Sequence, residues 1–423
     1  MKGLSVFIHG KLAGHVLAND GAISFEYEDN YSGTPLSLSM PTEVKKYNQK
    51  YILPWLEGAI PSSYAQRQGI ALSNELPKNN PIEILGVMGL DCAGAIQFTR
   101  IGEEDRIEDG ILQRVKDRYV ADTAIRDHLS PDYYKPWAAE GMNWSLSGCQ
   151  KKGVFTRLGN AWYAGFGATV SNYIVKPGIP NLFLEAFNEA LITNLAKFCG
   201  IETEEIEYQI INGASCIVIK RFDRDDDLNR IHQEDFCQLL HYSPEKKYAA
   251  DGGPSAVSIL KAIHKYSGMF MYYNLYNFTS QLFFNYLTLA TDAHAQNYSM
   301  RILYNRHGQL TPLYDCASYA PYANLNDRHH PLRLAMSIGG ENRYGKLSNT
   351  NINKYVEASQ LGKTEVTNIL DDIIYLIKNR FDNAFAKTVN GLTGNLEVYE
   401  KFYKDLKKKI ITHCNIIEKN MKR

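Results

Sequence analysis

An apolar helix that ends in a polar loop is the feature that most constrains the fold of this chain. Residues 269–290 are rich in Tyr, Phe and Leu, which predicts a buried helix. The following loop carries Asp292 and Asn297, and a predicted hairpin over 299–314 then leads to a second carboxylate, Asp315. Phosphoryl transfer from ATP needs this set, because one Asp orients or deprotonates the acceptor hydroxyl while an Asn and a later Asp hold Mg²⁺. The pattern therefore predicts a kinase catalytic loop.

A second block of the chain has the element order of a kinase N-terminal lobe. Over 143–230 we expect a strand, a loop, two strands, a helix and a hairpin. Lys176 ends an apolar strand, where its cation would reach the α- and β-phosphates, and Glu189 lies in the next helix, where it would pair with Lys176. The alternatives are a surface lysine before a turn and a solvated glutamate.

Two further features favour a nucleotide site without specifying one. The loop 145–152 combines small residues, backbone donors and lysines that would close over phosphates, although its pattern is also that of an ordinary hairpin. His294 is a candidate metal ligand or base, but we expect it to be buried and hydrogen-bonded, fixing the loop. Segment 35–41, enclosed by prolines, is predicted as a short strand.

The patterns together indicate an α+β protein with three parts. We expect an N-terminal α+β subdomain over 1–105, a kinase N-lobe with the nucleotide loop and hinge over 130–230, and a mainly helical C-lobe over 231–423. This is a protein-kinase-like fold of two lobes with an extra N-terminal subdomain.

Composition removes several classes of function. Lys and Arg together number 46, as do Asp and Glu, so the zero net charge gives no argument for nucleic acid or an anionic membrane. The seven cysteines are scattered and form no CxxC pair, which argues against a disulfide framework and a zinc site and fits a reducing cytoplasm. No apolar stretch approaches the roughly 20 residues that a membrane span needs. We therefore expect a cytoplasmic protein without a membrane partner.

Seven short motifs occur in one order along the chain, and together they resemble the HipA family, the serine/threonine kinase toxins of bacterial HipB–HipA toxin–antitoxin modules. The resemblance runs nearly from end to end. The matching segments are residues 35–41, 89–95, 145–152, 220–224, 233–238, 247–254 and 292–297.

The resemblance implies specific roles for the residues that match the family's motifs. Asp292 would be the catalytic base, Asn297 and Asp315 would hold Mg²⁺, and Ser145 or Ser147 would be autophosphorylated, which would eject the loop and silence the kinase. The backbone of 220–222 would meet the adenine as the hinge. The implied ATP-binding residues are Ser147, Gly148, Cys149, Gln150, Lys151, Lys152, Lys176, Lys220, Arg221, Phe222, His294, Asn297, Tyr314 and Asp315.

The resemblance also implies partners. These are a HipB-like helix-turn-helix antitoxin, operator DNA contacted only through that antitoxin, and a target protein in translation such as an aminoacyl-tRNA synthetase. The chain departs from the family at four positions: Ala293 replaces Gly, Gln296 replaces Lys, Cys149 replaces Ala, and Lys220 replaces an acidic hinge residue. The changes at Gln296 and Ala293 keep open the alternative of a weakly active kinase that acts with its antitoxin as a corepressor on DNA. A secreted effector kinase is another alternative, and the sequence gives no argument for or against export.

Overall fold

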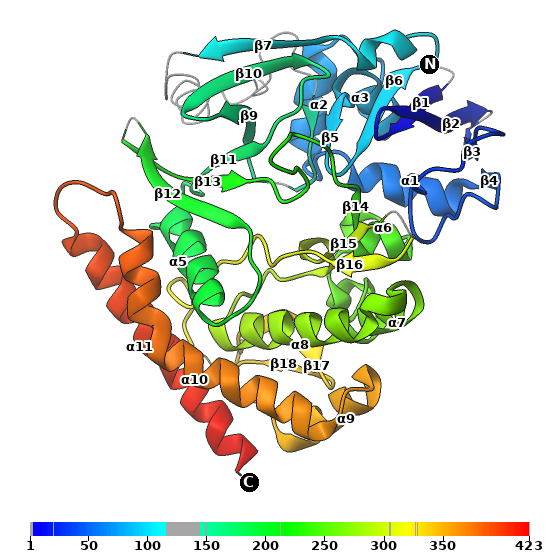
Figure 1. Cartoon of the computed structure of the whole chain (residues 1–423). Helices are drawn as coiled ribbons and strands as arrows, with labels where there is room; N and C mark the ends of the chain where they lie inside the picture. Colours follow the sequence, from blue (N-terminus) through cyan, green and yellow to red (C-terminus); the bar gives the residue numbers. More distant parts are fainter. Residues whose placement is uncertain are drawn as a thin grey trace.

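The computed structural model shows two lobes with an additional subdomain at the N-terminus (Figure 1). It describes residues 3–19, 21–115, 144–148, 150–211, 213–303, 306–325, 327 and 329–422. The expected domain boundary at residue 130 and the predicted nucleotide contact Cys149 lie outside the described residues. Within the described ranges, every helix is too short or too polar for a bilayer crossing.

The N-terminal subdomain is an antiparallel sheet covered by helices. The sheet order is β4-β3-β2-β1-β6, and β1, which lies between β2 and β6, is buried along its whole length. Side chains from both layers, including Trp55 and Phe98, form a core of their own. The elements are β1 (Gly3–Ile8), β2 (Lys11–Asn19), β3 (Ala22–Tyr27), β4 (Lys46–Tyr47), α1 (Gln49–Gly58), α2 (Tyr64–Ser73), α3 (Pro81–Met88), β5 (Asp91–Cys92) and β6 (Ile96–Arg100).

The strand predicted over 35–41 is wrong. The segment makes a single isolated bridge between Ser37 and Met40. Its backbone bonds instead to side chains of another segment: the Leu38 amide donates to Glu234 Oε1 over 2.8 Å. Because a buried carboxylate satisfies this amide, no neighbouring strand is required.

The N-lobe is built on a six-stranded antiparallel sheet in the order β12-β13-β11-β9-β10-β7. Helix α5 packs against β12 and β13 and is buried on nearly all sides. It ends at Phe198 and is followed by Gly200, whose left-handed φ of 78° suits a residue without a Cβ. The two strands expected over 143–155 are present as β8 and β9, but β8 lies outside this sheet and pairs in parallel with β5 of the N-terminal subdomain. The elements are η1 (Glu104–Ile107), β7 (Gly110–Val115), β8 (Trp144–Ser145), β9 (Gly153–Leu158), β10 (Ala161–Gly167), β11 (Tyr173–Pro177), α5 (Glu185–Phe198), β12 (Glu205–Ile211) and β13 (Ala214–Lys220).

The C-lobe is mainly helical, as predicted. Its long helices α10 and α11 pack along the outside of α8 and α5 (Figure 1). The helices are α6 (Phe236–Leu240), η2 (Pro244–Lys246), η3 (Ala249–Asp251), α7 (Ala256–Tyr266), η4 (Gly268–Phe270), α8 (Met271–Thr288), η5 (Ala295–Asn297), α9 (Asn349–Ser359), α10 (Lys363–Thr388) and α11 (Glu397–Met421). The strands are β14 (Gln233–Asp235), β15 (Ser299–Ile302), β16 (Gly308–Leu310), β17 (Arg333–Ile338) and β18 (Glu341–Arg343).

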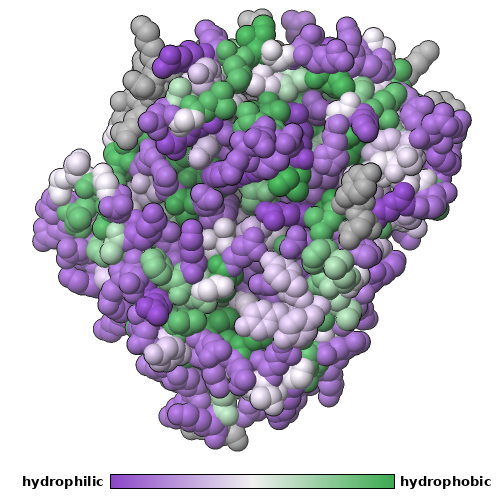
Figure 2. Space-filling model, in the orientation of Figure 1, coloured by the Kyte–Doolittle hydropathy of each residue, from purple (hydrophilic) through white to green (hydrophobic). Residues whose placement is uncertain are grey.

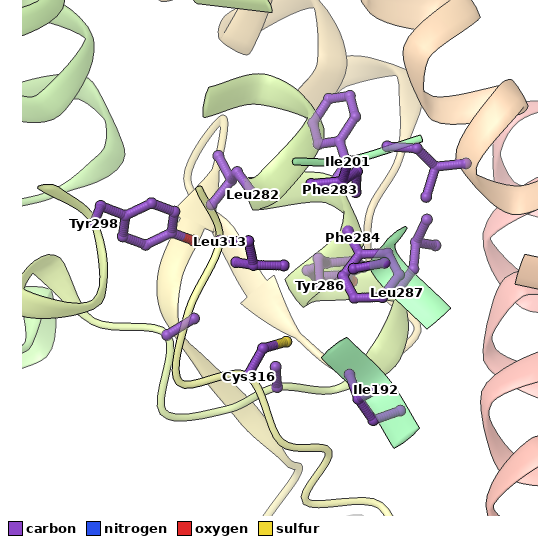
Figure 3. Close-up of a cluster of buried hydrophobic side chains, with 14 of the residues drawn as sticks. Ile192, Ile201, Leu282, Phe283, Phe284, Tyr286, Leu287, Tyr298, Leu313 and Cys316 are labelled. Atoms are coloured by element: carbon purple, nitrogen blue, oxygen red, sulfur yellow. The ribbon is translucent and has the colours of Figure 1, made fainter. Parts of the chain in front are cut away.

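Helix α8 fixes the position of the polar loop that follows it. Its side chains Phe283 and Phe284 are fully buried and lie in one cluster with Ile192, Leu313 and Cys316 (Figure 3). The surface in the orientation of Figure 2 is mostly hydrophilic, with apolar side chains in small separate groups. The large apolar core therefore anchors the C-terminal end of α8, and the loop at 291–297 starts from a rigid support.

Candidate active site

A cavity of about 480 Å³ lies where the two lobes meet. Its walls come from segments far apart in the sequence: the loop 146–152, the end of β11, helix α5, the segment after β13, and the two loops around Asp292 and Asp315. Most of the residues predicted to bind the nucleotide line this one space. Those are Ser147, Gly148, Gln150, Lys152, Lys176, Arg221, Phe222, His294, Asn297, Tyr314 and Asp315.

Lys176 is the centre of the polar end of the cavity. Its buried ammonium lies 2.7 Å from Glu189 Oε1 and 2.6 Å from Asp315 Oδ1. The ion pair between Lys176 and Glu189 that the sequence suggested is therefore present. Burial alone would lower the pKa of Lys176, but the attraction of Asp315 and Glu189 raises this pKa well above its usual value. The lysine stays charged.

Carboxylates outnumber the buried cation at this point. Glu185 and Glu204 are also buried beside the pair, and Glu204 Oε1 accepts a 3.3 Å hydrogen bond from the Asp315 amide. Burial raises the pKa of Glu189 to about 8 and that of Glu204 to about 7, against the attraction of Lys176. These raised pKa values reflect four carboxyl groups around one lysine, and an additional cation at this point would favour their ionised forms.

Asp315 has an unusual backbone conformation. Its φ of 56° is left-handed, which costs energy for a residue with a Cβ and occurs most often at functional positions. The side chain keeps 44% of its surface exposed toward the cavity. Its partial burial raises the pKa, but the ion pair with Lys176 outweighs this and holds the pKa of Asp315 well below its usual range. Asp315 is therefore an ionised carboxylate that a metal can reach.

The loop after α8 contributes Asp292 and Asn297 to the lining of the same cavity. Asn297 Nδ2 donates to the Asp292 carbonyl over 3.0 Å, which leaves the amide oxygen as the ligand atom. The Asp292 side chain is 66% exposed, and Tyr248 donates to its Oδ1 over 2.5 Å. His294 is buried, as expected, and burial lowers its pKa to about 4, so the ring is neutral. Within the described residues, His294 Nδ1 has no hydrogen-bond partner.

The predicted hinge residues divide between the cavity and the interior. Phe222 lines the cavity, and its ring lies 5.4 Å from that of Tyr314. The Arg221 guanidinium points into a buried ion cluster with Asp223, 2.8 Å away. Lys220 is not among the cavity-lining residues, and its ammonium pairs with the exposed Asp226. Of the three predicted hinge residues, Lys220 is therefore the one that does not line the cavity.

The loop 145–152 is tied to the N-terminal subdomain. Ser145 is buried and its hydroxyl donates to the Ala59 carbonyl over 2.8 Å, whereas Ser147 lines the cavity. Lys152 Nζ donates to the Ser147 carbonyl over 2.6 Å. Lys151 is buried and is not among the cavity-lining residues.

Sequence reasoning missed several groups around the cavity. Glu185 and Glu204 gave no signal because each lies among ordinary helix and strand residues. Lys247 lines the cavity beside the Asp292 loop, and Tyr248 follows it. Both residues lie in the matching segment 247–254, so the motif could have pointed to them. It gave no chemical role for either side chain.

A buried ion cluster behind the hinge was also missed. Asp91 of β5 lies 2.9 Å from Arg224, 3.0 Å from Arg230 and 3.4 Å from Arg221. Ser171 adds a hydrogen bond of 2.5 Å to the same carboxylate. Asp91 lies in the matching segment 89–95, and Arg221 and Arg224 lie in the matching segment 220–224. Arg230 follows six residues after Arg224. The cluster joins the N-terminal subdomain to the hinge.

Comparisons with known proteins place both parts of the chain in one family. The family model "HipA N-terminal domain" matches residues 4–99, and "HipA-like C-terminal domain" matches residues 144–381. A putative kinase of Sinorhizobium fredii, Y4mE, is 28% identical over 384 residues, covering 87% of this chain and 89% of the relative. The serine/threonine-protein kinase toxin HipA of Shewanella oneidensis is 24% identical over 428 residues, covering 96% and 92%.

One solved structure has the same fold. It is the complex of Shewanella oneidensis HipA with HipB and operator DNA, and the matching chain superposes with a TM-score of 0.80 at 21% identity. The match covers 98% of this chain and 97% of the other. The predicted kinase-like fold of two lobes with an N-terminal subdomain is confirmed.

Proposed function

The chain belongs to the HipA family, and from this premise we propose that it is an ATP- and Mg²⁺-dependent protein serine/threonine kinase. One observation carries the proposal: Lys176, Asp292, Asn297 and Asp315 come from distant segments and line one cavity. These are the residue types that neutralise phosphates, hold a metal and accept the proton of an acceptor hydroxyl.

The lining of the cavity suits both the base and the phosphates of ATP. Ile174, Ile219, Phe222 and Tyr314 offer apolar and aromatic surface for a base. Lys176 and Lys152 offer positive charge to phosphates. His294 also lines the cavity, and its ring is neutral.

The donor set fits Mg²⁺ better than a transition metal. The described residues contain no group of three or more His, Cys, Asp or Glu side chains arranged to hold a metal. Mg²⁺ commonly uses one or two protein oxygens and completes its shell with water and phosphate. Asn297 and Asp315 would hold it, and the surplus of carboxylates around Lys176 supplies the negative charge. The bound ion would neutralise charge that develops on the transferred phosphoryl group.

The proposed reaction transfers the γ-phosphoryl group of ATP to an acceptor hydroxyl. The acceptor hydroxyl oxygen forms a bond to the γ-phosphorus, the bond from that phosphorus to the bridging oxygen breaks, and ADP leaves with the electron pair. Asp292 accepts the acceptor's proton. Lys176 stays on the phosphates, and Glu189 holds Lys176 in place.

Phosphate transfer to the chain itself is the direct test. The protein is incubated with Mg-ATP, nucleotide affinity is measured by calorimetry, and phosphosites are mapped by mass spectrometry. We expect ATP binding and phosphate on Ser145 or Ser147, with Asp292→Asn binding ATP but transferring no phosphate. A wild-type chain that neither binds ATP nor acquires phosphate overturns the kinase proposal.

Ser147 and Ser145 differ in what modification would require. Ser147 already lines the cavity. Ser145 has to leave its bond to Ala59 and its pairing with β5 before it can react. Phosphate on either residue would place negative charge beside the ATP phosphates and would favour an open loop.

We also propose that the chain is the toxin of a HipB–HipA type module, with a target in translation such as an aminoacyl-tRNA synthetase. The support is family membership and the structural relative, a HipA in complex with HipB and operator DNA. Expression in cells tests this: growth arrest should require Asp292 and should be relieved by co-expressing a small helix-turn-helix partner. Arrest that persists in Asp292→Asn would favour the corepressor alternative.

A further inference from the structure

Asp292 is exposed, yet one side chain holds its carboxylate. Tyr248 donates to Asp292 Oδ1 over 2.5 Å. The other oxygen, Oδ2, lies 3.8 Å from His294 Nε2, too far for a hydrogen bond. An exposed aspartate without such a bond samples several rotamers, and a base that moves by about 1 Å can lose roughly 100-fold in rate.

The position of Tyr248 is set by contacts on three sides. Its ring meets the His294 ring edge-to-face with centroids 5.1 Å apart, and the Lys247 ammonium lies 5.2 Å from the centroid of the tyrosine ring. The Lys247 carbonyl accepts a bond from the Ala295 amide over 3.3 Å. The segment that carries Tyr248 is thus bonded directly to the loop that carries Asp292.

A tight turn holds this segment in shape. The Tyr248 carbonyl accepts bonds of 3.0 Å from the amides of both Asp251 and Gly253. A Cβ at Gly253 would lie 1.9 Å from the Lys246 carbonyl oxygen, so only glycine fits. The turn therefore fixes the backbone from which the tyrosine reaches Asp292.

Tyr248 is not among the residues that line the cavity, whereas Asp292 and His294 are. The tyrosine therefore holds Asp292 from outside the nucleotide space. We propose that Tyr248 is a positioning residue of the phosphoryl-transfer site: it holds one oxygen of Asp292 so that the other is directed to the acceptor hydroxyl. This inference rests on the proposed kinase function and extends it to a residue with no nucleotide contact.

The test separates the rate of transfer from nucleotide binding. Tyr248→Phe removes the hydroxyl and keeps the ring against His294. We expect single-turnover transfer of labelled γ-phosphate to the chain, at saturating Mg-ATP, to slow at least about tenfold. The dissociation constant for Mg-ATP should stay within about twofold, because Tyr248 does not line the cavity.

A matched control is available in the same chain. Tyr273 donates to Glu202 Oε2 over 2.7 Å, outside the cavity-lining residues, so Tyr273→Phe removes the same kind of bond. It should change neither rate nor affinity. Gly253→Ala, which forces the turn to shift, should reproduce the slow transfer of Tyr248→Phe with wild-type ATP affinity.

The outcomes separate the kinase proposal from the role of Tyr248. If the wild-type chain transfers no phosphate, the kinase proposal fails. If it transfers phosphate and Tyr248→Phe is equally fast, the kinase proposal stands and the role of Tyr248 is overturned. A loss of rate matched by an equal loss of ATP affinity also overturns it, since the tyrosine would then support the whole cavity.

Discussion

Asp315 and Lys176 lie 139 residues apart in the chain, yet their charged groups meet at 2.6 Å. Asp315 reaches the lysine from a left-handed backbone, and Lys176 reaches it from the end of β11. The contact therefore joins the two lobes through one ion pair at the floor of the cavity. Each partner can be altered separately, and the expected effects differ.

Replacing Asp315 by Asn or by Ala separates its charge from its backbone. Both variants should lose roughly 100-fold or more in phosphate transfer, because the site loses a charged metal ligand. Asn tolerates left-handed φ better than Ala, so Asp315→Ala should be less stable than Asp315→Asn by about 1 kcal/mol. Urea unfolding measures the difference, and equal stability of the two variants would contradict the strain assigned to φ.

Removing Lys176 leaves the surrounding carboxylates without their buried partner. We expect Lys176→Met to lower the free energy of unfolding by about 3 kcal/mol, the usual cost of an uncompensated buried charge. Adding Glu189→Gln should recover part of that loss, because it removes one of the stranded carboxylates. Chemical denaturation of the wild type, the two single variants and the double variant gives the coupling free energy between Lys176 and Glu189. Strictly additive losses of unfolding free energy would argue against the pairing.

Asp91 stabilises the joint between the N-terminal subdomain and the hinge. Asp91→Asn leaves three buried guanidinium groups short of one carboxylate, so we expect a loss of about 3 kcal/mol or more. Asp226→Asn is the matched control: its side chain is 90% exposed and pairs only with Lys220 among the described residues, so the change should stay below about 0.5 kcal/mol. Similar losses in both variants would contradict the importance of burial.

His413 makes stability depend on pH. Its Nδ1 donates to the Leu287 carbonyl and its Nε2 accepts from the Gly345 amide, each over 3.2 Å, so the ring is bound as the neutral form. Burial lowers its pKa from 6.5 to about 4. The stabilisation is complete above pH 6.5 and is lost as the pH falls toward 4, because the unfolded chain binds the extra proton first.

The size of this effect can be measured by denaturation at two pH values. Between pH 7 and pH 5, His413 alone should cost about 2 kcal/mol of unfolding free energy. In His413→Gln the difference between the two pH values should shrink by about that amount. The same difference in both proteins would show that His413 does not titrate in this way.

The parts of the site that are predictable are those with local patterns. Asp292, Asn297 and Asp315 follow a helix and a hairpin whose periodicity is clear, and Lys176 ends an apolar strand. The roles of Glu204, Tyr248 and Asp91 could not be predicted in this way, because they depend on contacts with segments up to 139 residues away. The periodicity of a sequence carries no information about contacts between distant segments.

In the fold, too, elements with a local sequence pattern are predictable and those that depend on distant contacts are not. The sequence patterns of α5 and α8 predict helices, and the structure contains them. The alternating pattern between prolines over 35–41 predicts a strand, but the Leu38 amide bonds to Glu234, which lies 196 residues further along. A backbone partner of that kind can be identified only in three dimensions.

The pairing of β8 with β5 limits how this protein could be divided by recombination. The same short contact region holds the nucleotide loop and, through Asp91, the hinge. The subdomain therefore supports the candidate nucleotide loop and the predicted hinge through direct contacts. Recombination that exchanged it between relatives would have to carry β5, Ala59 and their partners together, so these segments should be inherited as one unit.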